Sequence, residues 1–270
     1  MNYKTLTQIC GALAAVVVAS LIFVRKVPPV SYFFGVYLGI ALAVGVAPYG
    51  ALVYLEDREN SILDKDLLDY LSQVESYVKS GKNLLFAVTL PINERKRPLK
   101  KRLQKLELML KLGVNPDDAL QRTALSMPTL ISKEAFSVIH RLIVYGGNVG
   151  GVLESVREHL GDLYSIENEK RSIMRNYGSI IYISYFILLI ISIFILKFFV
   201  YRMVTTSFAS PFSSSLNSTL LKALILQFLV VEGLFSGLIT GKLMTGRMSS
   251  GLLHSAIMIV LGLTAYSLFA

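Results

Sequence analysis

Long apolar runs alternate with polar stretches along this chain. Five runs hold about 20 mostly apolar residues each, the length that crosses the hydrocarbon core of a bilayer as an α-helix. They are residues 6–24, 30–55, 180–199, 219–240 and 251–269. The first run is longer than the core of a secretory signal peptide, so we expect it to be retained. The pattern predicts a multi-pass membrane protein with about five transmembrane helices.

The polar stretch between the second and third runs also has a helical pattern. Apolar residues recur three or four positions apart from Ile62 to Val78, before Gly81, and again from Leu99 to Leu110, before Gly113. We therefore expect an all-α protein in three parts. These are two transmembrane helices in 1–55, a helical-bundle domain in 56–175 and three transmembrane helices in 176–270.

A short pattern occurs twice in this middle domain, because "LKLGVNPDDAL" aligns with "IVYGGNVGGVL". The aligned pairs are Gly113 with Gly146, Asn115 with Asn148, and Leu120 with Leu153. In both places a glycine ends one helix and an asparagine caps the next, with Pro116 and two aspartates favouring a helix start after Asn115. The repetition favours a bundle of antiparallel helical hairpins.

The last helix of the middle domain is expected to continue into the third apolar run. Between residues 152 and 200 there is no proline, and the only glycines are Gly161 and Gly178. At about 1.5 Å per residue an unbroken helix of this kind is roughly 70 Å long. Glu167 and Arg171 are four residues apart in the order that favours a helix ion pair, which contributes about 0.2–0.5 kcal/mol.

Composition and charge agree with a membrane protein. The 270 residues are 53% hydrophobic and 17% charged, against about 25% charged in an ordinary soluble domain. The net charge is +9, yet residues 56–175 are nearly balanced, with 19 basic and 17 acidic residues. The excess lies beside the apolar runs, as expected at a bilayer surface, and we expect no nucleic-acid partner. The positive-inside tendency places the middle domain in the cytoplasm.

Small residues recur at four-residue spacing in three apolar runs. The glycines among them are Gly11, Gly35, Gly39, Gly233, Gly237 and Gly241. Stripes of this kind let helices approach closely in lipid, so we interpret them as packing surfaces rather than as a conduit for a substrate.

Patterns associated with enzymes are absent or incomplete in the sequence. "GLITGKL" has three residues between its glycines instead of four and lacks Ser or Thr after Lys242, and "YGGNVGG" follows no predicted strand. Cys10 is the only cysteine, and His140, His159 and His254 have no metal-ligand spacing. We expect no catalysis, no cofactor and no metal.

Glu232 is the one acid within the apolar runs that follow the middle domain. A carboxyl group inside a bilayer is costly, which makes it a candidate for function. Because the sequence offers no second acid to form a relay, we favour a structural hydrogen bond with Ser or Tyr of a neighbouring helix.

A dense basic run, "RKRPLKKRLQK", lies in the middle domain. Its basic residues are Arg95, Lys96, Arg97, Lys100, Lys101, Arg102 and Lys105. Three interpretations stay open: a solvated helix face, a contact with an acidic protein surface, and a contact with anionic lipid, where each basic residue contributes about 1 kcal/mol.

Two blocks of sequence resemble a known family. "YGGNVGGVLESVREHLGDLYSIENEKRSIMRNYGSIIYISYFILLI" and "GLITGKLMTGRMSSGLLHSAIMIVLG" resemble the membrane platform proteins of archaeal type IV pili and archaella. These are the TadC-like and FlaJ-like members of the type II secretion F-domain family. The resemblance covers about residues 82–270 and implies a multi-pass protein of the cytoplasmic membrane with a cytoplasmic helical F domain.

The resemblance also implies partners and residue roles. It implies that a hexameric secretion ATPase acts on the F domain while pilin-like subunits enter a filament, without catalysis by the platform. It makes Glu167, Glu169, Lys170 and Arg171 candidates for contact with the ATPase. The basic run apart from Arg102, whose charge suits an acidic protein surface, is the other candidate for this contact. It assigns structural roles to Gly146, Gly147, Leu153, Gly237, Gly241, Gly251 and His254. Because this chain has one F domain, it implies pairing with a second copy or a related subunit.

Two other functions stay open on the sequence. One is a small-solute or ion transporter that uses Glu232 in its glycine-rich segment. The other is a membrane sensor or adaptor. The predicted arrangement, five transmembrane segments around one large internal domain, does not divide into the inverted halves that are common among transporters.

Overall fold

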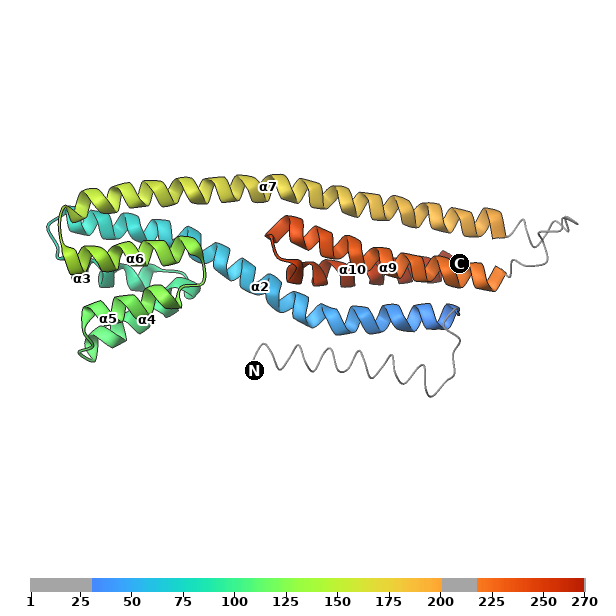
Figure 1. The fold of residues 1–270 in the computed structure, drawn as a ribbon, viewed down its shortest axis with the longest axis horizontal. Coiled ribbons are helices and arrows are strands. Elements are labelled where there is room, and N and C mark those ends of the chain that lie inside the picture. Colours follow the sequence, from blue (N-terminus) through green and yellow to red (C-terminus); the bar gives the residue numbers. More distant parts are fainter. Residues whose placement is uncertain (1–30, 201–217, 270) are drawn as a thin grey trace, which may run out of the picture. The chain divides into compact units, whose positions relative to one another are not determined.

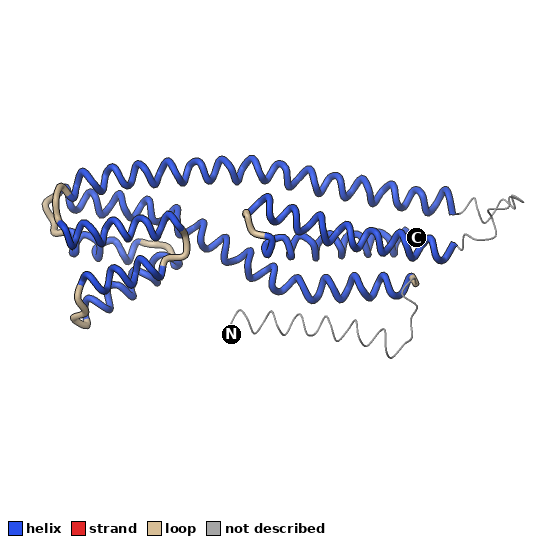
Figure 2. Tube along the Cα trace, in the orientation of Figure 1, coloured by secondary structure: helices blue, strands red, loops and turns tan. Residues whose placement is uncertain are grey.

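The computed structural model describes residues 31–200 and 218–269, which form helices and no strand (Figure 2). The α-helices are α2 (Tyr32–Lys79), α3 (Leu84–Thr89), α4 (Arg97–Lys111), α5 (Pro116–Ser126), α6 (Leu130–Tyr145), α7 (Val149–Ile195), α9 (Ser218–Thr245) and α10 (Met248–Phe269), as labelled in Figure 1. A short 3₁₀ segment, η1 (Leu90–Glu94), follows α3, and a π-helical turn, η2 (Leu196–Val200), ends α7. The all-α prediction is confirmed for these residues.

The chain divides into two compact units. Residues 56–170 form one, called here the helical unit. The described residues in 31–55 and from 171 onward form the other, called here the membrane unit. Helices α2 and α7 each contribute residues to both units.

The helical unit has one apolar core to which all six of its α-helices, α2 to α7, contribute. Leu67 and Tyr70 of α2, Leu103 of α4, Phe136 of α6 and Leu160 of α7 are all fully buried in it. The Tyr70 ring stacks on Phe136 with 6.1 Å between ring centroids. Its hydroxyl donates a hydrogen bond of 2.8 Å to the Val88 carbonyl oxygen, which satisfies a polar atom inside the core.

Helix α2 joins two segments that the sequence analysis treats separately. The second apolar run and the stripe from Ile62 to Val78 belong to one helix of 48 residues. Pro48 lies inside it, and its ring removes one backbone donor without ending the helix. Gly81 follows with φ of +87°, a conformation that favours glycine and suits the end of a helix.

Helix α7 confirms the prediction of an unbroken helix from the middle domain into the third apolar run. It extends over 47 residues, from Val149 to Ile195, and neither Gly161 nor Gly178 interrupts it. Gly161 has open space around it, whereas Gly178 accommodates the side chain of Met244 on α9.

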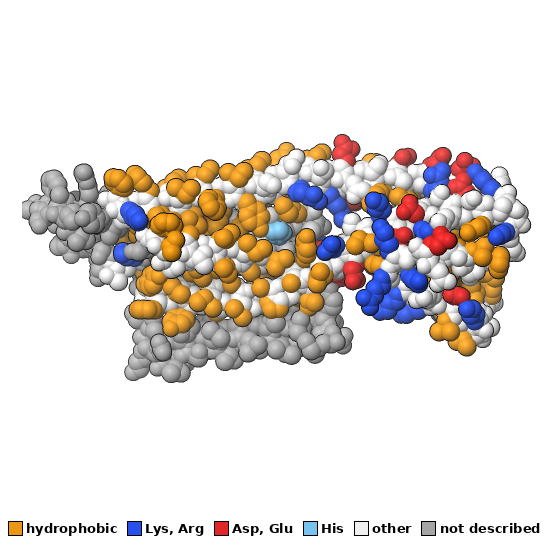
Figure 3. All heavy atoms as spheres, turned by 180° about the vertical axis from the view of Figure 1, so that it is seen from behind, with side chains coloured by type: hydrophobic (Ala, Val, Ile, Leu, Met, Phe, Trp, Pro, Cys, Tyr) orange, Lys and Arg blue, Asp and Glu red, His pale blue; other side chains and the backbone are white. Residues whose placement is uncertain are grey.

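Four helices in the described residues are long and apolar enough to cross a membrane: α2, α7, α9 and α10. They correspond to the second to fifth predicted runs, while the first run, with Gly11 and Cys10, lies outside the described residues. Within the membrane unit, Figure 3 shows hydrophobic side chains spread over the visible outer surface of the helices. Ile187 and Phe194 of α7 are more than half exposed, as side chains that face lipid would be.

The glycines of α9 bring its backbone against that of α10. A Cβ atom on Gly237 would lie 2.1 Å from the Ser255 nitrogen, and one on Gly241 would lie 2.0 Å from the Gly251 Cα. A Cβ on Gly251 would in turn lie 2.6 Å from the Leu238 Cα. The predicted packing role of these glycines is thus seen directly, and the short turn at Gly246 joins the two helices.

The small residues of α2 pack against the same pair of helices. A Cβ on Gly35 would lie 3.0 Å from Leu226 of α9, and one on Gly39 would lie 2.8 Å from Leu263 of α10. Gly50 is not among the glycines named from the sequence, yet its approach to α10 is closer still. A Cβ on Gly50 would lie 2.3 Å from the Leu253 nitrogen.

We predict that Gly237→Ala destabilises the full chain in detergent. The new methyl group collides with backbone rather than with a flexible side chain, and overpacking of this kind costs about 1–3 kcal/mol. Gly161→Ala on α7 is the control, since nothing lies within 4 Å of its Cβ position, and alanine improves helix propensity by up to about 1 kcal/mol. In thermal unfolding followed by circular dichroism, the midpoint of Gly237→Ala should lie below that of the parent and the midpoint of Gly161→Ala above it. Equal midpoints for Gly237→Ala and the parent would contradict the close packing.

Candidate functional site

The basic run begins beyond η1 and covers the first half of α4. Pro98 occupies the first turn, where its missing N–H costs nothing. Leu99, Leu103 and Leu106 are fully buried, which fixes the apolar face of α4 against the core and turns the intervening basic residues outward. Lys96, Arg97, Lys101 and Lys105 are exposed, and Lys100 and Arg102 are half-buried.

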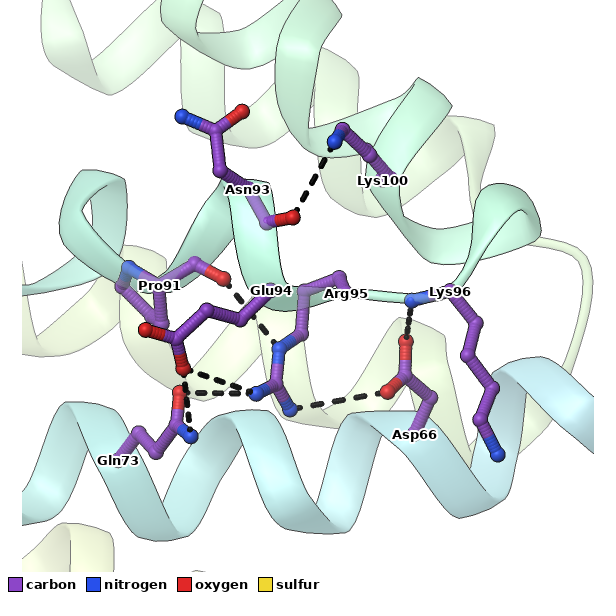
Figure 4. Close-up of polar contacts among 8 residues, drawn as sticks. All are labelled: Asp66, Gln73, Pro91, Asn93, Glu94, Arg95, Lys96 and Lys100. Atoms are coloured by element: carbon purple, nitrogen blue, oxygen red, sulfur yellow. Dashed lines mark hydrogen bonds and ion pairs between the residues drawn. The ribbon is translucent and has the colours of Figure 1, made fainter.

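Arg95 differs from the rest of the run, and its predicted place on an exposed contact surface is corrected here. Only 6% of its side chain is exposed. As Figure 4 shows, its guanidinium group points toward α2, where Nη1 lies 3.6 Å from Asp66 Oδ1 and Nη2 donates to Gln73 Oε1 at 2.9 Å. Its Nε donates to the Pro91 carbonyl oxygen at 3.3 Å. These bonds satisfy the group internally, so Arg95 positions the chain between η1 and α4.

Asp66 holds the start of α4 through two contacts. Besides the ion pair with Arg95, its Oδ2 accepts a 2.7 Å hydrogen bond from the Lys96 backbone nitrogen (Figure 4). Lys100 Nζ donates to the Asn93 carbonyl oxygen at 3.2 Å. The buried carboxylate therefore places the exposed basic residues that follow.

A hollow of about 220 Å³ lies between α2 and α4. It is lined by Glu59, Asn60 and Leu63 of α2 and by Pro98, Lys101, Arg102 and Lys105 of α4. Arg102 Nη1 also donates to the Ser126 carbonyl oxygen at the end of α5. Three of the seven basic residues of the run thus line a concave surface, a feature that sequence spacing alone does not reveal.

A second polar network joins α2 to α7 at the other end of the helical unit. Lys79 Nζ lies 2.7 Å from Glu75 Oε1 and 3.1 Å from Glu154 Oε2, and Arg157 Nε donates to Glu75 Oε2 at 2.8 Å. The hydrogen bond from Lys79, assisted by Arg157 against the opposing effect of burial, lowers the pKa of the Glu75 carboxyl group. The sequence analysis missed this network.

The repeated turns are structural, as their pattern predicts. Asn115 Oδ1 accepts from the Asp117 nitrogen at 3.1 Å, and Asn148 Oδ1 accepts from the Gly151 nitrogen at 3.2 Å, so each asparagine caps the helix that follows. Gly113, Gly146 and Gly147 have φ of +79°, +71° and +107°, and Leu120 and Leu153 are buried.

The charged residues of the α7 segment from Glu167 to Arg171 lie on one continuous helix. Glu169 and Lys170 are exposed, while Glu167 and Arg171 are half-buried. The boundary between the two compact units lies between Lys170 and Arg171. The structure thus leaves Glu169 and Lys170 accessible to a partner.

In the membrane unit, Glu232 has a local hydrogen-bond partner. Ser236, one turn further along α9, donates to its Oε1 at 3.0 Å, so the donor comes from the same helix rather than from a neighbouring one. His254 of α10 lies next to α7, where its Nδ1 is 2.7 Å from the Tyr182 hydroxyl. Tyr185 donates to the Met258 carbonyl oxygen at 2.9 Å. Together these contacts connect α7 with α10 and give His254 a packing role.

In the described ranges, 31–200 and 218–269, no group of three or more His, Cys, Asp or Glu side chains is arranged to hold a metal ion. The exposed basic residues of α4 and the exposed Glu169 and Lys170 of α7 are among the polar groups with which the helical unit can contact other molecules.

Comparison with known proteins identifies the family of one region. Residues 70–196 match the family model described as "Type II secretion system (T2SS), protein F". A T2SS protein F domain is thus found over the last ten residues of α2, over α3 to α6, and over the whole of α7. Neither the curated proteins nor the solved structures give a match.

We predict that Arg95→Met destabilises the full chain by about 3–5 kcal/mol, because it leaves the buried Asp66 carboxylate without its cation. Arg97→Met, two residues away and exposed, should change stability by no more than about 0.5 kcal/mol. Urea unfolding measures both. The double variant Asp66→Asn with Arg95→Met should recover part of the loss, since the unpaired charge is gone. Equal effects at the two arginines would contradict the burial of Arg95.

Proposed function

We propose that the chain is the membrane platform of a type II secretion-like or type IV pilus-like machine of the cytoplasmic membrane. The observation that carries the proposal is the T2SS protein F match at residues 70–196. That match includes most of the compact helical unit and a helix, α7, that continues into an apolar run long enough to cross a bilayer.

In this proposal the helical unit lies in the cytoplasm, where a hexameric secretion ATPase acts on it. Pilin-like subunits enter the filament beside the membrane unit, and the work comes from ATP hydrolysis by the partner. Helices α2 and α7 suit such a role because each is a single element with one part in each unit. A movement of the helical unit can then reach the membrane through the backbone of these two helices.

The resemblance of the two sequence blocks to archaeal TadC-like and FlaJ-like platforms favours a pilus or archaellum over a secretion pseudopilus. With one F domain in the chain, a complete platform would hold two copies or a copy and a related subunit. The glycines of α9 are not the surface for this pairing, because they already pack against α10.

The function is tested by deleting the coding sequence in the native cell. We expect the surface filament or the secreted substrate to disappear while pilin-like subunits still accumulate in the membrane. Restoring the intact chain should restore assembly. Normal assembly in the deletion strain would contradict the platform role.

The contact with the ATPase is proposed to use the basic residues outside the hollow, namely the exposed Lys96 and Arg97 and the half-buried Lys100. Reversing all three to glutamate should weaken binding of the full chain in nanodiscs to the cell's secretion ATPase about tenfold, with a larger loss at low salt. The matched control reverses Lys65, Arg122 and Lys133, which are exposed elsewhere on the helical unit. Equal losses for the two triple variants would show that only net charge matters and would contradict this contact.

A further inference from the structure

The hollow between α2 and α4 carries a net positive charge. Lys101, Arg102 and Lys105 face one acid, Glu59, so the lining carries a net charge of about +2. Within the part of the chain that the structure describes, neither Lys101 nor Lys105 forms an ion pair. Lys and Arg side chains gather on the surface of the helical unit in Figure 3. Cations held together at a concave surface favour an anion.

The hollow lies close to the end of an apolar run. The second run ends at residue 55, and Glu59, Asn60 and Leu63 follow within the same helix, α2. At about 1.5 Å per residue these residues are roughly 6–12 Å beyond the hydrocarbon edge. The headgroup layer on each side of a bilayer is about 5–8 Å thick. Glu59 is therefore at the level of lipid headgroups, and Leu63 is a few ångströms beyond them.

The chemistry of the lining suits a phosphate group. Arg102 uses one guanidinium nitrogen for the Ser126 carbonyl oxygen, and its remaining N–H groups can bind phosphate oxygens in the paired geometry that arginine favours. The Asn60 amide adds a neutral donor. A volume of about 220 Å³ admits a headgroup, and Leu63 and Pro98 provide apolar lining for its glycerol carbons.

We propose that this hollow binds the phosphate of an anionic lipid headgroup, with Lys101, Arg102 and Lys105 as its ligands. The inference needs the membrane placement of α2 and does not depend on the ATPase. Glu59 opposes the bound anion and so limits the affinity. A lipid held in the hollow fixes the distance of α4 from the bilayer surface.

Lysine footprinting of the full chain in nanodiscs tests the proposal. The probe is phosphatidylglycerol, compared with nanodiscs of phosphatidylcholine alone, and the readout is the acylation rate of each lysine by mass spectrometry. We expect phosphatidylglycerol to slow acylation of Lys101 and Lys105 about fivefold. Lys133, an exposed lysine on α6, should react at the same rate in both.

Two variants sharpen the test. Arg102→Gln should abolish the protection of Lys101 and Lys105, whereas Glu59→Gln should increase it, because removal of the only acid in the lining strengthens anion binding. Arg122→Gln, at an exposed arginine of α5, should leave the protection unchanged. If Glu59 and Arg102 had only structural roles, the two substitutions would not change the protection of Lys101 and Lys105 in opposite directions.

Three results would overturn the proposal. Protection by inorganic phosphate in phosphatidylcholine nanodiscs, equal to that by phosphatidylglycerol, would mean that the site takes a free anion. Equal protection by the two lipids would mean that charge is not recognised. No protection by either would mean that the hollow is empty. None of these results affects the proposed platform role. That role is contradicted only by normal filament assembly in the deletion strain or by the ATPase-binding experiment.

Discussion

Backbone hydrogen bonding in lipid is the constraint on which this structure depends. A segment inside the hydrocarbon core must satisfy its N–H and C=O groups internally, so it is helical, and nothing obliges that helix to end where the hydrocarbon ends. In α2 and α7 the helix continues for more than 20 residues beyond the apolar run. The extended parts then supply about a third of the buried apolar core of the helical unit, through side chains such as Leu67 and Leu160. Membrane insertion and domain folding thus share two helices.

The charged residues of the helical unit have different roles according to whether their side chains are buried or exposed. Arg95 forms an ion pair with Asp66 and donates hydrogen bonds to Gln73 and to the Pro91 carbonyl oxygen, which fixes the turn before α4. The basic residues immediately after it remain accessible because the leucines of α4 face inward. One contiguous run of basic sequence therefore contains a structural residue, an exposed surface and a cationic hollow.

Local features of the fold were predictable from the sequence, while distant contacts were not. The helix start at Asn115 and the stops at Gly81, Gly113 and Gly146 depend on residues within a few positions of one another, and the structure has them where the pattern predicts. The inward turn of Arg95 depends on Asp66, 29 residues earlier, and the network at Glu75 depends on Arg157, 82 residues later. Nothing in a single sequence specifies such pairings. Gly50 is a similar case, since only the approach of α10 explains it.

The central claim is that α7 is one helix from the helical unit into the membrane. Amide hydrogen exchange of the full chain in nanodiscs measures this directly, because every amide in an unbroken helix is bonded to a carbonyl four residues earlier. The account predicts slow exchange without interruption from Gly161 through Ile183, including the amides on both sides of Arg171. A window of fast exchange around Lys170 and Arg171, between two protected segments, would contradict it.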